Sequence, residues 1–145
     1  MATGITNSSV GDLRQYDIVC YYWGQRPDAA EGVATSNRQW AYNRDYLSFD
    51  SSTDTFTVLK DFKAKVKVIG NGARNGTAGN SGRFVLTIRF YVGSTVVITG
   101  TINENGDTTP AETAYSFTKN NTFKVTGYHA TNVYAVDIGF IIEIA

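Results

Sequence analysis

The chain has 145 residues, the usual length of one domain, and 42% of them are hydrophobic, which excludes a wholly disordered protein. Its 13 basic and 13 acidic residues give a formal net charge of +0, so the chain has no long-range attraction to nucleic acid or anionic lipid. One cysteine and one histidine exclude an intrachain disulfide framework and a zinc site built from these two residues alone.

Residues 1–45 form a first region, in which apolar residues are scattered and follow no clear period. One apolar cluster, Ile18 to Trp23, predicts a strand or an extended docking segment. The region carries a large aromatic load that should not stay in water. We interpret it as an attachment segment that docks on a partner through Tyr16, Tyr21, Tyr22, Trp23, Trp40 and Tyr42. The alternative is that it folds back and supplies one or two edge strands to the following domain.

Alternation of apolar and polar residues with a period of two begins after residue 45. In residues 61–69, apolar residues alternate with Lys63, Lys65 and Lys67, which predicts a half-buried strand with a lysine-rich solvent face. Further strands are expected at residues 46–49, 55–59, 83–91, 95–102, 115–117, 123–125 and 134–144, with turns at Gly93 and at residues 119–121. About eight strands with one apolar face each predict an all-β antiparallel sandwich, a jelly roll, over residues 46–145.

The last predicted strand, residues 134–144, is apolar on both faces. Its first face carries large aliphatic and aromatic residues, and its second face carries Ala135, Asp137, Gly139 and Ile141. Because a strand that is covered on both sides loses its alternation, the second face must also meet something. We take these four residues as the candidate oligomer interface. Cover by the N-terminal segment of the same chain is an equal alternative.

Residues that could perform chemistry are few. The Gly-rich loop from Gly70 to Gly82 contains Arg74 and predicts a long hairpin connection; a binding loop at the rim of the sandwich is the less favoured interpretation. Cys20 lies in an apolar run and is expected to be buried, and His129 has no nucleophile motif nearby. We therefore predict no enzymatic activity, no catalytic residue, no metal and no cofactor.

The order of signals in residues 56–61, 84–93, 115–125 and 140–144 resembles the small C1q/TNF-like jelly-roll domains of bacteriophage fibre and capsid-surface proteins, such as head fibre and decoration proteins. The resemblance covers residues 46–145. It departs from the family pattern at residues 62–64, where the family usually has Gly and an aromatic residue just after the first strand.

The resemblance implies a homotrimer with a structural or receptor-binding role on a virion, in the capsid or the tail. Its implied partners are further copies of the chain, other virion proteins and, for an adhesive protein, a host-surface glycan. The first thirty residues show no signal peptide and no stretch is long enough to span a bilayer, which agrees with assembly in a bacterial cytoplasm. The alternative function is a lectin-like carbohydrate-binding module, with Trp23, Trp40, Tyr42 and Tyr46 as stacking platforms.

Overall fold

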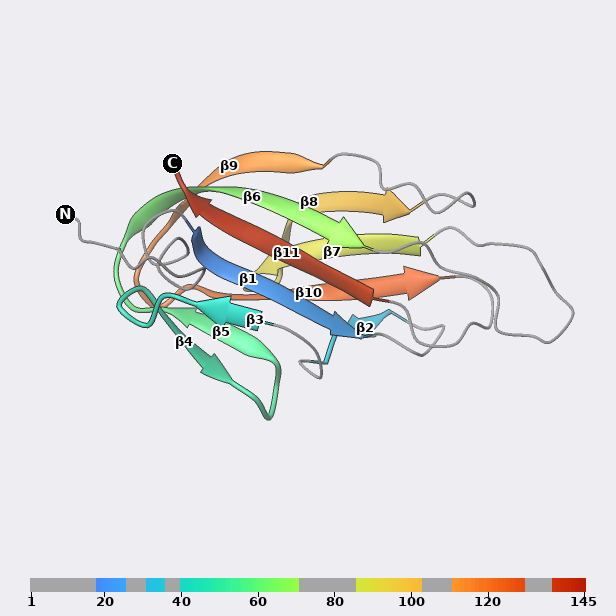
Figure 1. The fold of residues 1–145 in the computed structure, drawn as a ribbon, viewed down its shortest axis with the longest axis horizontal. Helices are drawn as coiled ribbons and strands as arrows, with labels where there is room; N and C mark the ends of the chain where they lie inside the picture. Colours follow the sequence, from blue (N-terminus) through green and yellow to red (C-terminus); the bar gives the residue numbers. More distant parts are fainter. Residues whose placement is uncertain (1–17, 26–30, 36–39, 71–85, 103–110, 130–136) are drawn as a thin grey trace, which may run out of the picture.

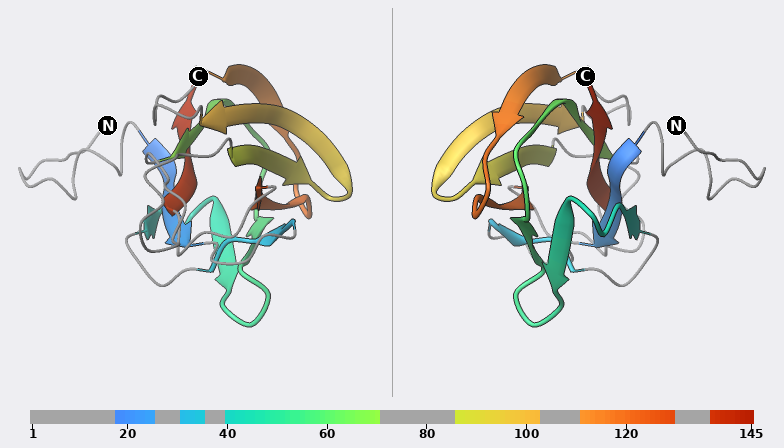
Figure 2. Two further views of the ribbon diagram at one scale, coloured as in Figure 1. Left: turned by 90° about the vertical axis from the view of Figure 1, so that its right-hand side faces the viewer. Right: turned by 90° about the vertical axis from the view of Figure 1, so that its left-hand side faces the viewer.

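The computed structural model of the chain describes residues 18–25, 31–35, 40–70, 86–102, 111–129 and 137–145. These residues form two antiparallel sheets that enclose one core (Figures 1 and 2). The first sheet has the order β3-β1-β11-β6-β9, and the second has the order β4-β5-β10-β7-β8, with β2 paired to β10. The strands are β1 (Ile18–Gln25), β2 (Gly32–Val33), β3 (Trp40–Tyr42), β4 (Leu47–Asp50), β5 (Thr55–Val58), β6 (Phe62–Gly70), β7 (Leu86–Val92), β8 (Thr95–Ile102), β9 (Glu112–Phe117), β10 (Thr122–His129) and β11 (Asp137–Ile144).

The predicted β-sandwich is confirmed as a jelly roll. The chain passes from one sheet to the other between β5 and β6, between β6 and β7, and at each connection from β8 to β11. Strand β6 shows most clearly why the sequence forms a sandwich strand, because Phe62, Ala64, Val66 and Val68 are buried while Lys63, Lys65 and Lys67 are exposed. Only an antiparallel strand with one covered face leaves that pattern. The predicted turn at Gly93 is also confirmed, since its φ of 59° lies in the left-handed region that favours glycine.

Aromatic rings fill the space between the sheets. Phe140 of β11 meets Phe123 of β10 with ring centroids 5.6 Å apart, and Phe90 of β7 with centroids 5.0 Å apart. All three rings are at most 1% exposed. Each such burial contributes about 1.5–3 kcal/mol to stability, so these cross-sheet contacts are a main reason why the two layers stay together.

The strand pairing does not follow the boundary expected at residue 45. Strand β1 lies between β3 and β11, inside the first sheet and not at its edge (Figure 1). The described part of residues 1–45 thus follows the fold-back alternative, with a more central strand than expected. The period-two pattern is hidden by a shift in register between Ile18 and Cys20, where two successive residues, Val19 and Cys20, are both buried.

Candidate functional site

The outer face of the first sheet brings together two groups of residues that the sequence analysis treated separately. In the β1–β11 ladder, Tyr21 lies opposite Ile141, and Trp23 lies opposite Gly139. Opposite residues of an antiparallel pair project on the same side of the sheet. Tyr22 and Phe140, which form the pair between these two, are buried and face the core, so the Tyr21–Ile141 and Trp23–Gly139 pairs on either side face outward.

We call this surface the outer apolar patch. Tyr21, Trp23 and Ile141 are half-buried. On the neighbouring strands, Ala41 lies opposite Tyr21 and Ile69 lies opposite Gly139, so both project on the same side of the sheet. The patch consists of Tyr21, Trp23, Ala41, Ile69, Gly139 and Ile141. It covers β3, β1, β11 and the end of β6.

Gly139 sets how closely β1 and β11 approach. A Cβ atom at this position would lie 3.0 Å from Cε3 of Trp23 and would collide with the carbonyl oxygen of Tyr22. The missing side chain therefore leaves room for the indole of Trp23 beside the backbone of β11. This explains why the second face of the last strand is small, a feature that the sequence shows without revealing its partner.

The patch is bordered by charge on β6 and β9. Lys67 lies beside Ile141 on one side and opposite Glu112 on the other, and Lys65 lies opposite Glu143. Opposite charges placed across a ladder are favourable, and they keep this part of the face in water. The outer face of the first sheet therefore has an apolar half and a charged half.

Three residues expected to dock a partner instead belong to the core or its edge. Tyr22 is 1% exposed and donates its hydroxyl hydrogen bond to the carbonyl oxygen of Ala34 at 2.6 Å. Trp40 lies opposite Tyr22 and Tyr42 lies opposite Cys20, so both project to the inner side of the sheet. The rings of Trp40 and Tyr42 stack with centroids 5.2 Å apart, and Trp40 also meets Phe49 at 4.9 Å. Their prediction as partner anchors is therefore corrected.

The remaining candidates divide in two groups. Tyr16, Arg74 and Ala135 lie outside the described residues. Asp137 lies opposite Gln25 at the start of β11, next to the patch.

Cys20 is 0% exposed, which confirms its predicted burial, and burial raises the pKa of its thiol well above the usual value. A thiol that stays protonated is a poor nucleophile.

Within the described ranges, no three histidine, cysteine, aspartate or glutamate residues gather as metal ligands. The same residues include no helix that is long and apolar enough to cross a membrane.

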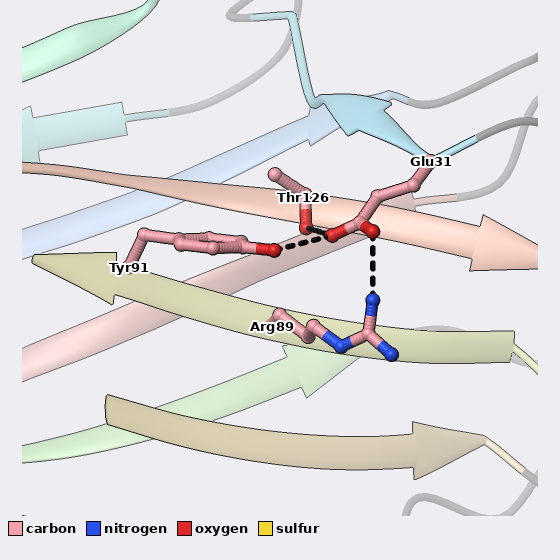
Figure 3. A network of polar contacts seen from close by, with 4 residues as sticks. All are labelled: Glu31, Arg89, Tyr91 and Thr126. Atoms are coloured by element: carbon pink, nitrogen blue, oxygen red, sulfur yellow. Dashed lines mark hydrogen bonds and ion pairs between the residues drawn. The ribbon is translucent and has the colours of Figure 1, made fainter. Parts of the chain in front are cut away.

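A second candidate site, which is polar, lies on the outer face of the second sheet, and the sequence analysis missed it. Glu31, just before β2, accepts hydrogen bonds from three side chains on β7 and β10 (Figure 3). Its Oε1 accepts from Arg89 at 2.7 Å, and its Oε2 accepts from the hydroxyls of Tyr91 at 2.7 Å and Thr126 at 2.9 Å. Arg89 and Tyr91 are two residues apart on a strand, a visible signal, but Glu31 comes from an irregular segment.

These contacts keep Glu31 ionised. Its pKa is lowered chiefly by the hydrogen bond from Tyr91; burial opposes this, and the hydrogen bonds from Thr126 and Arg89 lower the pKa further. The same hydrogen bond raises the pKa of Tyr91, and Glu31 raises the pKa of Arg89. The side chain of Arg89 is 36% exposed and that of Glu31 is 33% exposed, so both still meet water and the ion pair lies at the surface.

A surface hollow of about 480 Å³ adjoins this network. On one side lies Tyr91, whose ring centroid is 5.7 Å from Nζ of Lys124. The hollow is lined by Glu31, Gly32, Val33, Tyr91, Gly93, Ser94, Lys124 and Thr126. It thus combines a fixed carboxylate, an ammonium group, hydroxyls and one aromatic ring.

The strand order and crossovers define the chain as a jelly-roll β-sandwich, and comparison with solved structures agrees. Murine APRIL superimposes with a TM-score of 0.53 at 8% identity, over 86% of this chain and 97% of that chain. Eiger TNF from S. frugiperda gives 0.49 at 6% identity over 89% and 94%, and the globular domain of zebrafish complement 1qA gives 0.48 at 11% over 88% and 96%.

At these identities the likeness shows the fold and nothing more. No protein-family profile and no curated protein sequence matches the chain. The jelly-roll fold that the resemblance implied is thereby confirmed. None of the three structures comes from a bacteriophage, so the phage origin stays a prediction.

Proposed function

We propose that the chain is a non-enzymatic structural or binding protein that acts as a homotrimer, with its subunits meeting at the outer apolar patch. The observation that carries the proposal is the meeting of Tyr21, Trp23 and Ile141 on one outward face. Aromatic and aliphatic side chains gathered in this way are typical of the centre of a protein interface.

The charged half of the same face fits the edge of such an interface. Interfaces usually have an apolar centre and a hydrated polar rim, and Lys65, Lys67 and Glu112 are exposed beside the patch. Closed cyclic symmetry would cover the patch in every copy without leaving an open surface for further growth. The C1q/TNF-like resemblance of residues 46–145 supports three copies.

Sedimentation velocity at micromolar concentration tests the assembly. The wild-type chain should sediment as a trimer, and Ile141→Glu should sediment as a folded monomer, because the charge enters the centre of the interface. Val96→Glu is the matched control, since Val96 is 42% exposed on β8 of the other sheet. A monomeric wild-type protein would overturn the proposal, and so would an Ile141→Glu variant that unfolds, because Ile141 would then serve the subunit core.

The finer part of the proposal is a place on a bacteriophage virion, as a head fibre, capsid decoration or tail-fibre component. It is supported by the phage members of the family that residues 46–145 resemble. Capsid, portal or tail genes beside the gene for this chain would support it, and a neighbourhood without any virion gene would overturn it.

The lectin-like alternative is weakened at three of the four positions first considered for it, whereas the fourth, Trp23, faces outward in the patch. Trp40 and Tyr42 pack on the inner side, and Tyr46 meets Phe62 with ring centroids 5.3 Å apart. Lys60 also covers the Tyr46 ring, with Nζ 4.4 Å from its centroid. Flat faces that already pack on protein groups are poor platforms for a sugar ring.

A further inference from the structure

The hollow beside Glu31 has features of a small-molecule site. Its volume of about 480 Å³ lies within the range of about 300–1,000 Å³ common to such sites. It belongs to the second sheet, between β2, β10 and the turn after β7, whereas the outer apolar patch belongs to the first sheet. A trimer built on the patch would therefore leave the hollow open.

The carboxylate in the hollow is held in place before any ligand arrives. Glu31 receives three donors, from Arg89, Tyr91 and Thr126. A carboxylate has about four acceptor positions, and Oε1 uses one of its two for Arg89. Oε1 can therefore accept one more hydrogen bond, and a ligand hydroxyl is a suitable donor.

The positive and negative charges in and around the hollow do not balance. Arg89 neutralises Glu31, and among the described residues no carboxylate forms an ion pair with Lys124, so its ammonium group adds a positive charge to the lining. One ammonium group suits a single carboxylate on the ligand. A doubly charged phosphate would meet repulsion from Glu31 and only one lysine, so phosphorylated ligands fit less well.

The ring of Tyr91 has a fixed orientation because its hydroxyl is tied to Glu31, and Nζ of Lys124 lies 5.7 Å from the ring centroid, so a ligand held by Lys124 also lies beside this ring. The hydroxyl of Ser94 and the backbone at Gly93 complete the wall at the turn. Such a mixture demands a ligand with hydroxyl donors, a negative group and a weakly apolar face.

We propose that this hollow binds an acidic saccharide, with the ligand carboxylate at Lys124, a ligand hydroxyl donating to Glu31 and the sugar ring beside the Tyr91–Lys124 pair. The inference gives a chemical class to the receptor-binding side of the proposed function, but it does not require the trimer. The site differs from the aromatic positions that the sequence suggested for sugar binding.

Amide chemical-shift titration of the full chain tests this, with D-glucuronate, D-glucose and acetate as probes. Glucuronate should give saturable shifts at residues 31–33, 91–94 and 124–126. Glucose should bind about fivefold more weakly, because it lacks the charge that meets Lys124. Absence of saturable shifts with glucuronate would overturn the proposal. Acetate binding as tightly as glucuronate would overturn it too, because the hollow would then be an anion site only.

Two variants locate the binding. Lys124→Gln should weaken glucuronate binding about fivefold and leave glucose binding unchanged. Lys63→Gln, which removes an exposed lysine on the other sheet, should change neither. Equal weakening by both variants would show a general charge effect and overturn the site.

Sedimentation of the same samples separates this inference from the trimer. A trimer that does not bind glucuronate removes only the saccharide site. A monomer that binds it supports the saccharide site and removes only the assembly.

Discussion

The outer faces of the two sheets differ although their inner faces are alike. Both sheets turn buried aromatic and aliphatic residues inward, and Phe90, Phe123 and Phe140 meet across the core. Outward, the first sheet presents the outer apolar patch beside a charged half. The second sheet presents hydroxyls, Arg89 and the carboxylate of Glu31, and Val96 and Tyr128 are also exposed on it.

This difference indicates what each outer face can do. An apolar face with an aromatic residue packed beside a glycine gains free energy when another surface covers it. A polar face with satisfied hydrogen bonds gains little from burial and suits a small hydrated ligand. The jelly roll supplies the same layered core for both, and the outward residues decide the function.

The largest expected effect separates the two sides of one strand. Phe140→Ala should lower the free energy of unfolding by about 4 kcal/mol, because it leaves a cavity between the sheets where the ring is 0% exposed. Ile141→Ala, the next residue, should cost about 1 kcal/mol in the isolated subunit, because the side chain is only half-buried. Urea unfolding at one protein concentration low enough for the subunits to be monomeric measures both. Equal losses would show that the two faces of β11 are covered alike within the subunit.

A second experiment addresses the approach of β1 to β11. Gly139→Ala should cost about 2–3 kcal/mol, because the new methyl group meets the carbonyl oxygen of Tyr22 and the backbone must shift. Gly93→Ala is the control, where no atom lies within 4 Å of the added Cβ and only the positive φ opposes the change. It should cost about 1 kcal/mol. A neutral Gly139→Ala would mean that the ladder has room, and that Trp23 is held by other contacts.

Much of the fold could be predicted because period-two alternation is a local signal. Strands β6 and β7 show it plainly, and the exposed lysines of β6 follow from it. Strand β1 lies where a strand or docking segment was expected, at Ile18 to Trp23, but its central place in the sheet was not expected, and the register shift near Ile18 puts two neighbouring residues in the core. Which strands become neighbours depends on the crossovers, and these leave no local pattern in the sequence.

The candidate sites could be predicted only in part, for the same reason. The small second face of the last strand predicted either an oligomer interface or cover by the N-terminal segment, but the residue beside Gly139, Trp23, lies more than a hundred positions earlier in the chain. The aromatic residues of 18–42 look alike in the sequence, yet Tyr21 faces outward and Tyr22 inward. The Glu31–Arg89 pair joins residues 58 positions apart, a separation that composition cannot reveal.

A third, smaller effect tests the hydrogen bond that ties the N-terminal strand to the segment before β3. Tyr22→Phe keeps the ring stacked on Phe140, whose centroid is 5.1 Å away, and removes the donor to the carbonyl oxygen of Ala34. The buried carbonyl then lacks this partner, so we expect a loss of about 1–2 kcal/mol in urea unfolding. Burial raises the pKa of the Tyr22 hydroxyl, so the loss should be the same at every pH from neutral to mildly alkaline. A neutral effect would show that water or another donor replaces the hydroxyl.

The smallest effect concerns the polar face and depends on pH. The pKa of Glu31 is lower in the folded chain than its usual value, chiefly because Tyr91 donates a hydrogen bond to the carboxylate. The resulting stability is therefore fully present above the unfolded-state pKa of about 4.3, and it is lost as the pH falls through the lower folded-state value. Glu31→Gln should cost about 1 kcal/mol at neutral pH, a small amount because the ion pair is exposed to water. Urea unfolding of both proteins at neutral pH and at pH values below the carboxylate range should show this difference shrinking in acid. A difference that stays constant with pH would mean that the shape of the side chain, and not its charge, holds the segment before β2 against β7 and β10.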